Sequence, residues 1–281
     1  GLGKTVRVLV FAEGEEAKII RAADQIVSEG IGEVILIGRP QVIQEKIGNL
    51  VWVGRSLIFT LGIVIWILLQ PNLSTSLVIL VIWFALLWAS GLKLSHLLIF
   101  IAGGITLPFA AFPFLQEYQQ RRILNFLFPD PTASYGENYN IQQALISIGS
   151  GGLLGKGYFQ GTQIHLRFLK VRWSDFIFSG TAEEFGFVGA VVVMLLLIFI
   201  VVRCLRAARL ARDTYGALIC FGVATVLTFQ GFVNIGVNLK LLPATGLPLP
   251  FISYGGSSLL SLLLGIGLVE SVILRHKSLE F

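Results

Sequence analysis

Long apolar stretches, separated by short polar segments, dominate this 281-residue chain after residue 50. A helix that crosses a bilayer needs about 20 predominantly apolar residues, and most of these stretches approach or reach that length. The pattern predicts about six transmembrane helices, over Ser56–Gln70, Leu73–Ser90, Leu94–Leu115, Phe176–Val202, Ala217–Leu239 and Gly256–Leu274. The first is the shortest, so by length alone it is also compatible with one arm of a buried hairpin.

The first 50 residues follow a different pattern. Residues 6–11 and 33–38 are short apolar runs typical of buried strands, residues 15–30 have the spacing of an amphipathic helix, and residues 39–48 begin another helix. Two strands and a helix bury too little surface to be reliably stable alone. We therefore predict a βαβ fragment over residues 1–50 and a transmembrane domain over residues 51–281.

Composition indicates an integral membrane protein. Hydrophobic residues make up 55% of the chain and charged residues 13%, with a mean hydropathy of +0.81, whereas soluble domains carry about 25% charged residues. Cys204 and Cys220 fall in apolar spans and imply no disulfide framework. His96, His165 and His276 are scattered and form no metal-ligand cluster.

The basic residues predict the orientation. If the six spans alternate, one side of the membrane receives Arg55, Lys93, Arg203, Arg206, Arg209, Arg212, Arg275 and Lys277. Because Lys and Arg accumulate on the cytoplasmic side, both termini are predicted to be cytoplasmic. The long connection over residues 116–175 and the loop over residues 240–255 then lie outside.

The outer connection over residues 116–175 is too long for a simple link, and such loops are usually functional. The stretch "YQQRRILNFLF" is typical of an interfacial helix, and "NIQQALISIGSGGLLGKG" is an apolar stretch that ends in flexible glycines. Its cations are Arg121, Arg122, Lys156, Arg167, Lys170 and Arg172. They either provide solubility and contact with anionic headgroups, or form a basic groove for a phosphorylated substrate.

Long composite motifs carry a resemblance to a known family. Residues 118–190, with "YQQRRILNFLF", "GKGYFQGTQ" and "WSDFIFSGTAEEFG", resemble the large outer loop of the SEDS family, the RodA, FtsW and SpoVE proteins. The stretch "NIGVNLKLLPATGLPLPFISYGGSS" resembles the end of the family's penultimate helix and the loop after it. The likeness covers residues 55–281 and is nearest to RodA. It implies an all-α polytopic membrane protein, a SEDS fold truncated by the loss of its first helices, behind a short N-terminal α/β fragment.

The resemblance also implies a function. It is that of a peptidoglycan glycosyltransferase, which polymerises lipid II at the outer face of the bacterial cytoplasmic membrane in cell elongation and cell shape. A class B penicillin-binding protein is the implied protein partner. Membrane lipids are expected around the chain, and no nucleic acid.

Candidate site residues follow from matching motifs position by position. The family's essential aspartate falls on Asp175 in "WSDFIF", the implied catalytic residue. The same matching implies substrate contacts at Gln119, Arg122, Lys156, Thr162 and Gln163. Two further substrate-binding candidates come from the residues themselves: Glu183, and Ser257 as a hydroxyl expected to line the same groove. The chain departs from the family at "QPNLST", where Asn72 replaces an aspartate and Ser74 a glycine.

The N-terminal fragment has a resemblance of its own. Its "FAEGEEAKIIRAA" and "ILIGRP" stretches resemble the opening of the phosphate acetyltransferase domain, but no later part of that enzyme follows. We expect no acyltransferase activity from it. The opening "GLGKT" imitates the tail of a phosphate-binding loop without its preceding strand, so no nucleotide site is expected.

The chemistry of polymerisation agrees with the placement of Asp175. A sugar hydroxyl is a poor nucleophile and needs a general base within hydrogen-bond reach. Ser174 is a good helix cap, which predicts Asp175 in the first turn of a membrane helix. The alternative role is a carboxylate that only favours the helix dipole. The leaving pyrophosphate needs cations, from basic side chains or a divalent ion such as Mg²⁺ or Mn²⁺.

Glu183 and Glu184 are adjacent on the same predicted helix. Adjacent helical positions point about 100° apart, so at most one of the two faces the groove of Asp175. Substrate contact is one role for them. The other is structural, with bonds to neighbouring helices or to loop amides.

Three functions remain open from the sequence. The first is the lipid-II-polymerising glycosyltransferase, and the second is a lipid II flippase, whose path would be lined by intramembrane charges. The clearest acidic residues gather at the outer surface instead, which argues against transport. The third is an inactive remnant that keeps the outer loop of the family without its full helical frame.

Overall fold

The computed structural model describes residues 8–11, 33–36, 50–70, 72–92, 100, 102–104, 106, 112–114, 116–128, 137–166, 168–169 and 173–276. In the N-terminal fragment, β1 (Val8–Phe11) and β2 (Glu33–Leu36) pair in parallel, with Val8 opposite Glu33. Both strands lie inside the stretches predicted as strands. The helices predicted over residues 15–30 and 39–48 lie outside the described residues.

Apolar helices make up most of the described residues after residue 50. In the described part, α9 (Ile177–Leu210), α10 (Thr214–Asn238) and α11 (Gly256–His276) are long and apolar enough to cross a membrane. Two further apolar helices are α3 (Leu50–Leu69) and α4 (Leu73–Ala89). Helix α3 begins six residues earlier than the predicted span. Most of the span predicted over residues 94–115 lies outside the described residues, apart from short helical pieces such as η1 (Phe112–Phe114).

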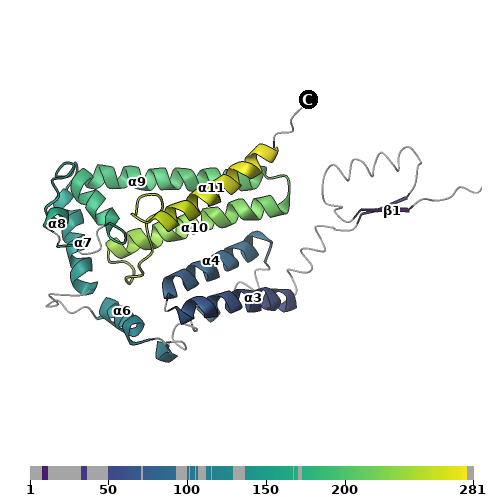
Figure 1. Ribbon diagram of the computed structural model, residues 1–281, viewed down its shortest axis with the longest axis horizontal. Coiled ribbons are helices and arrows are strands. Elements are labelled where there is room, and N and C mark those ends of the chain that lie inside the picture. The colour runs from purple at the N-terminus through teal and green to yellow at the C-terminus, as the bar shows by residue number, and fades with distance from the viewer. Residues whose placement is uncertain are drawn as a thin grey trace, which may run out of the picture.

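The membrane helices pack around α10. Figure 1 shows α9, α10 and α11 side by side, with α4 against α10 and α3 beyond α4. Between α9, α10 and α11 the packing is tight because small side chains occupy the contact, including Cys204, Ala207, Cys220 and Ala224. The two cysteines are free and buried, as expected of small apolar residues.

The connection over residues 116–175 is partly helical, as predicted. It contains α6 (Glu117–Leu127), α7 (Glu137–Gly151) and α8 (Thr162–His165). These helices gather at one end of the bundle, here called the loop end, together with the loop over residues 239–255 (Figure 1). Exposed Arg203, Arg206 and Arg209 lie near the other end of α9, here called the arginine end. The polar loops and the arginines of α9 therefore lie at opposite ends of the bundle.

Helix α9 is broken at Gly186, which has φ 69° and ψ −165°. The glycine loop, residues 151–157, fills the break and satisfies the backbone groups that the interruption frees. Its hydrogen bonds run from Lys156 N to Glu183 O (3.0 Å), Gly157 N to Glu184 O (3.0 Å), Phe187 N to Gly152 O (2.9 Å) and Val188 N to Leu153 O (3.1 Å). The sequence predicted a span over Phe176–Val202 and did not predict this break. The glycines of the loop allow the two backbones to meet.

Candidate active site

Asp175 lies in a turn over residues 173–176 at the loop end. Helix α9 begins at Ile177, its N-cap is Phe176, and no side chain of the N-cap residue bonds to the helix. The prediction that Ser174 caps the helix with Asp175 in its first turn is therefore wrong. The loop over residues 239–255 holds the turn instead, because Ser253 Oγ donates to Ser174 O (2.6 Å) and Tyr254 N donates to Trp173 O (2.8 Å).

Two asparagines of α10 hold the turn from the other side. Asn234 Nδ2 and Asn238 Nδ2 both donate to the backbone oxygen of Asp175, at 3.0 and 2.9 Å. Asn238 Oδ1 accepts from Ser179 N at 3.1 Å and so supplies the cap that α9 lacks. Sequence reasoning missed both residues. The sequence does hold a signal for them, since two amides lie four residues apart in an apolar helix. Polar groups at membrane depth face protein or water, so the pair could have been expected to bond to another part of the protein.

The Asp175 carboxylate is half-buried and lies close to the loop after α10. A Cβ at Gly246 would lie 3.7 Å from Asp175 Oδ2, and Gly246 has φ +75°. Burial raises the pKa of Asp175 above its ordinary value, while the hydrogen bond from Ser174 and the charge of Arg122 lower it less. A carboxyl with a raised pKa holds a proton more readily, which suits a general base.

Two polar cavities are lined by neighbours of Asp175, the larger by Gly246 and the smaller by Arg122, although no residue of the turn lines either. The smaller, about 320 Å³, is lined by Tyr118, Gln119 and Arg122 of α6. The larger, about 610 Å³, is lined by Gly246 and by polar side chains of α10 and α11 that include Gln230, Ser257 and Ser258.

The two cavities share three lining residues. These are Asn72 and Ser74 at the start of α4 and Thr245 of the loop. Ser74 Oγ donates to the backbone oxygen of Thr245. The two positions at which the chain departs from the family motif therefore line both cavities.

The α6 candidates lie on the smaller cavity but are also used locally. Gln119 is buried, its Oε1 accepts from Gln116 N at 3.1 Å, and its Nε2 donates to Tyr118 Oη at 3.0 Å. The Arg122 guanidinium lies 5.7 Å from the centre of the Tyr118 ring, a cation–π distance. Arg121 pairs with Glu117 at 3.5 Å on the surface. Arg167, Lys170 and Arg172 lie outside the described residues.

The remaining candidates form a second cluster at the break in α9. Lys156 Nζ lies 2.8 Å from Glu183 Oε1, and the same oxygen accepts from Thr162 Oγ1 (3.2 Å) and Gln163 N (3.0 Å). Glu183 has no exposed side-chain surface. Four residues predicted to bind substrate thus bond to one another. For Glu183 this geometry favours the structural role, with bonds to loop amides.

The Lys156–Glu183 ion pair is testable through stability. Lys156→Met removes the cation and leaves a buried carboxylate. Losing a partner of a buried pair costs about 3–5 kcal/mol. We expect about 2 kcal/mol of lost unfolding free energy, since 29% of the Lys156 side chain is exposed. Thermal unfolding in detergent measures it. Adding Glu183→Gln to Lys156→Met should restore part of the loss. Equal melting of parent and single variant would contradict the role of the pair.

The predicted divalent ion finds no ready-made protein site in the described part of the chain. No group of three or more His, Cys, Asp or Glu side chains comes together there. The described residues thus do not form a metal-ligand set.

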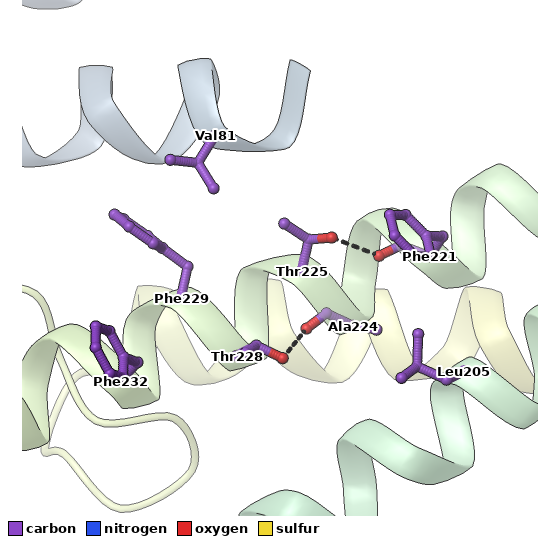
Figure 2. A pocket seen from close by; sticks show the side chains of 8 residues that line it. All are labelled: Val81, Leu205, Phe221, Ala224, Thr225, Thr228, Phe229 and Phe232. Carbon is purple, nitrogen blue, oxygen red and sulfur yellow. Dashed lines mark hydrogen bonds between the residues drawn. The ribbon is translucent and has the colours of Figure 1, made fainter. Parts of the chain in front are cut away.

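A third cavity is apolar and lies along the helices. It has about 370 Å³ and is lined by α4, α9 and α10, as Figure 2 shows for Val81, Leu205, Phe229 and other side chains. Its hydroxyls, on Thr225 and Thr228, donate to carbonyl oxygens of their own helix at 2.9 and 2.8 Å. This groove therefore offers hydrocarbon contact, and the polar chemistry stays at the loop end.

Comparison with known proteins identifies the class. The sequence model of the Cell cycle protein family, FtsW/RodA/SpoVE, matches residues 34–278, most of the chain. The chain therefore belongs to this family. A second family model, Phosphate acetyl/butaryl transferase, matches residues 3–55. Both resemblances drawn from the sequence are thus confirmed.

Individual relatives are named as peptidoglycan enzymes. The chain is 39% identical over 214 residues to peptidoglycan glycosyltransferase MrdB of Escherichia coli, a match of 75% of this chain and 57% of MrdB. A structure titled as a peptidoglycan synthase complex that coordinates polymerization and crosslinking contains a chain that is 34% identical. That match has a TM-score of 0.69 over 86% of this chain and 65% of the other.

A third match supports the likeness to RodA. The rod shape determining protein RodA of Thermus thermophilus, in a crystal structure of a variant, is 30% identical to this chain. The TM-score is 0.54 over 86% of this chain and 63% of RodA. The chain thus spans somewhat more than half the length of its matched relative MrdB.

Proposed function

We propose that this chain carries the lipid-II-polymerising site of a peptidoglycan glycosyltransferase, with Asp175 as general base. The observation that carries the proposal is the position of Asp175. Its carboxylate is half-buried in a turn fixed by α10 and the loop over residues 239–255, beside the larger polar cavity and under the charge of Arg122. Relatives named as glycosyltransferases of peptidoglycan support it.

The reaction assigns a task to each part of the site. A sugar hydroxyl of one lipid II attacks the anomeric carbon of another, the bond from that carbon to the pyrophosphate breaks, and the hydroxyl proton passes to Asp175. The smaller cavity carries Arg122, which suits the growing negative charge of the leaving pyrophosphate. The larger cavity carries Ser257, Ser258 and Gln230, whose hydroxyls and amide suit sugar hydroxyls.

The protein partner is proposed on the same basis. One structural match comes from a complex whose title joins polymerization and crosslinking. Polymer made by this chain needs a crosslinking enzyme, and a class B penicillin-binding protein provides that chemistry. Co-purification of this chain with such a transpeptidase from membranes tests the assignment.

The site requires the loop end to face outward, which predicts a labelling pattern. Gln160→Cys lies on exposed surface at the loop end, and Tyr215→Cys replaces a side chain that is 74% exposed near the arginine end. In sealed cells an impermeant thiol reagent should label the first and spare the second, because the arginines face the cytoplasm. Cys204 and Cys220 are buried and should contribute little background. Labelling of Tyr215→Cys alone would reverse the orientation.

Polymerisation is tested with labelled lipid II in proteoliposomes. The 281-residue chain is compared with a chimera in which residues 55–281 follow the N-terminal helices of MrdB. Glycan polymer that depends on Asp175 supports the proposal. Polymer from the chimera alone identifies the chain as an inactive remnant of the site, and ATP-independent movement of lipid II without polymer supports the flippase.

A further inference from the structure

We propose that Asn234 and Asn238 are positioning residues that set the place of the Asp175 carboxylate relative to the wall of the larger cavity. The inference rests on the proposed function, because it concerns the base of that reaction. It adds two residues of α10 to the site, neither of which lines either of the two polar cavities.

The two amides are buried and bond to the turn that carries Asp175. Both side chains are almost fully buried, with exposed fractions of 2% for Asn234 and 0% for Asn238. Both donate to the same oxygen, the backbone carbonyl of Asp175, and Asn238 Nδ2 also donates to Asn234 O at 2.9 Å. Buried amides are retained where their hydrogen bonds are satisfied, and here the shared acceptor is the residue that carries the base.

The Asn234 amide bonds both to the turn that carries Asp175 and to the loop after α10. Asn234 Nδ2 donates to Asp175 O at 3.0 Å and to Leu247 O at 2.8 Å. Leu247 follows Gly246, the residue whose backbone lies next to Asp175 Oδ2. Asn234 therefore fixes the turn and the loop against each other, and with them the separation between the carboxylate and the cavity wall.

The residues at the start of α9 supply no side-chain cap of their own. The turn lies ahead of α9, and the N-cap residue makes no side-chain cap bond. Asn238 Oδ1 instead accepts from Ser179 N and from Ser179 Oγ. Without the asparagines, the turn would keep its two bonds to Ser253 and Tyr254 and lose those to α10.

Displacement of the base lowers the rate of the reaction steeply. Misplacement of a reacting group by about 1 Å can cost about 10²-fold in rate. A released turn would also expose the carboxylate to water, and burial is the largest cause of the raised pKa of Asp175. In the described residues the charged group that acts on this carboxyl is Arg122 of α6. Release should therefore move the acid limb of the pH–rate profile to lower pH.

The test uses isosteric substitutions. Asn234→Leu and Asn238→Leu keep the approximate side-chain size, remove the amide donors and add no charge beside Asp175. Asn234→Leu leaves the Asn238 cap on Ser179 in place, so it carries the test if Asn238→Leu accumulates poorly. The matched control is Thr228→Val on the same helix, which removes a hydroxyl bonded at 2.8 Å to its own helix.

The first measurement needs no activity. Hydrogen exchange of the 281-residue chain in nanodiscs should speed up by about 10-fold at residues 173–180 in both asparagine variants, as expected for a lost buried hydrogen bond. The rest of α9 and Thr228→Val should keep parent protection. Unchanged exchange at residues 173–180 would overturn the positioning role.

The second measurement is the rate of polymerisation, made with the 281-residue chain or with the chimera, whichever forms polymer. Both asparagine variants should turn over about 10²-fold more slowly, with the apparent KM for lipid II near the parent value and the acid limb moved to lower pH. Parent rate and parent pH profile, together with a dead Asp175→Asn, would sink the positioning inference alone. An active Asp175→Asn would sink the proposed function itself.

Discussion

Asp175→Asn is expected to reduce glycan polymerisation by a factor of about 10² to 10⁴, the usual cost of removing a general base. The amide keeps the size of the carboxyl and much of its hydrogen bonding, so the turn over residues 173–176 should remain folded. Only the ability to accept the hydroxyl proton is lost. Polymer formed from labelled lipid II is the measurement, with expression and membrane insertion compared in parallel.

The rate of polymerisation should depend on pH in a direction set by the pKa of Asp175. A base works in its deprotonated form, and burial raises the pKa of Asp175 above its ordinary value. The rate should therefore rise with pH through a limb that lies above the ordinary carboxyl range, and fall as the pH drops below it. Replacing Arg122 by Met removes a charge that lowers this pKa, so the limb should move further upward.

The matched control for Asp175→Asn is the same substitution at the other end of the bundle. Asp213 is the N-cap of α10 and accepts from Gly216 N at 3.3 Å. Asp213→Asn should weaken the cap by no more than about 1 kcal/mol and leave turnover intact. Parent-rate polymerisation by Asp175→Asn would show that the Asp175 carboxylate is not the base, and the mechanism would fail.

Gly151→Ala is expected to unfold the junction between the glycine loop and α9. A Cβ at Gly151 would lie 2.0 Å from Ala182 O and 2.9 Å from Ala182 C, both backbone atoms of the facing helix. Backbone cannot rotate away as a side chain can, so α7 and α9 must separate. Overpacking of this kind typically costs about 1–3 kcal/mol, and we expect the upper end. Thermal unfolding in detergent and the yield of monodisperse protein measure the loss.

The chain offers a close control for this change. Gly149 lies two residues earlier in the same helix, and a Cβ there would meet nothing within 4 Å. Gly149→Ala should be neutral or stabilise by about 0.5–1 kcal/mol, because alanine loses less backbone entropy in a helix. If the two variants melt together, the close approach at Gly151 does not govern the stability of the junction.

Several features of the site were predictable from residues close together in sequence. The helices over residues 117–127 and 137–151 overlap the stretches over residues 118–128 and 140–157 that the sequence singled out in the outer connection. Asp175 was selected by its motif, and the structure places it beside a polar cavity. Ser257 was selected as a groove residue and lines that cavity. The helices could be predicted because spacing reports on local structure, whereas the roles of Asp175 and Ser257 stay predictions.

Other features could not be predicted, because they depend on contacts between distant segments. The break in α9 at Gly186 needs the glycine loop, some thirty residues earlier, to satisfy the freed backbone groups. A glycine in an apolar run does not predict that a distant loop will bond to the helix there. Lys156 and Glu183 were both predicted to bind substrate, and the fold instead pairs them at 2.8 Å.

Sequence by itself determined the class of the protein and its apolar helices, and it singled out the aspartate that we propose as the base. Hydropathy and motif are properties of the chain in one dimension, and each is set by neighbouring residues. Only the tertiary structure decided what holds that aspartate. Asn238 lies 63 residues from Asp175 along the chain and 2.9 Å from its backbone oxygen. Buried amides find partners through packing, and packing is fixed when α9, α10 and the loop after α10 close on one another.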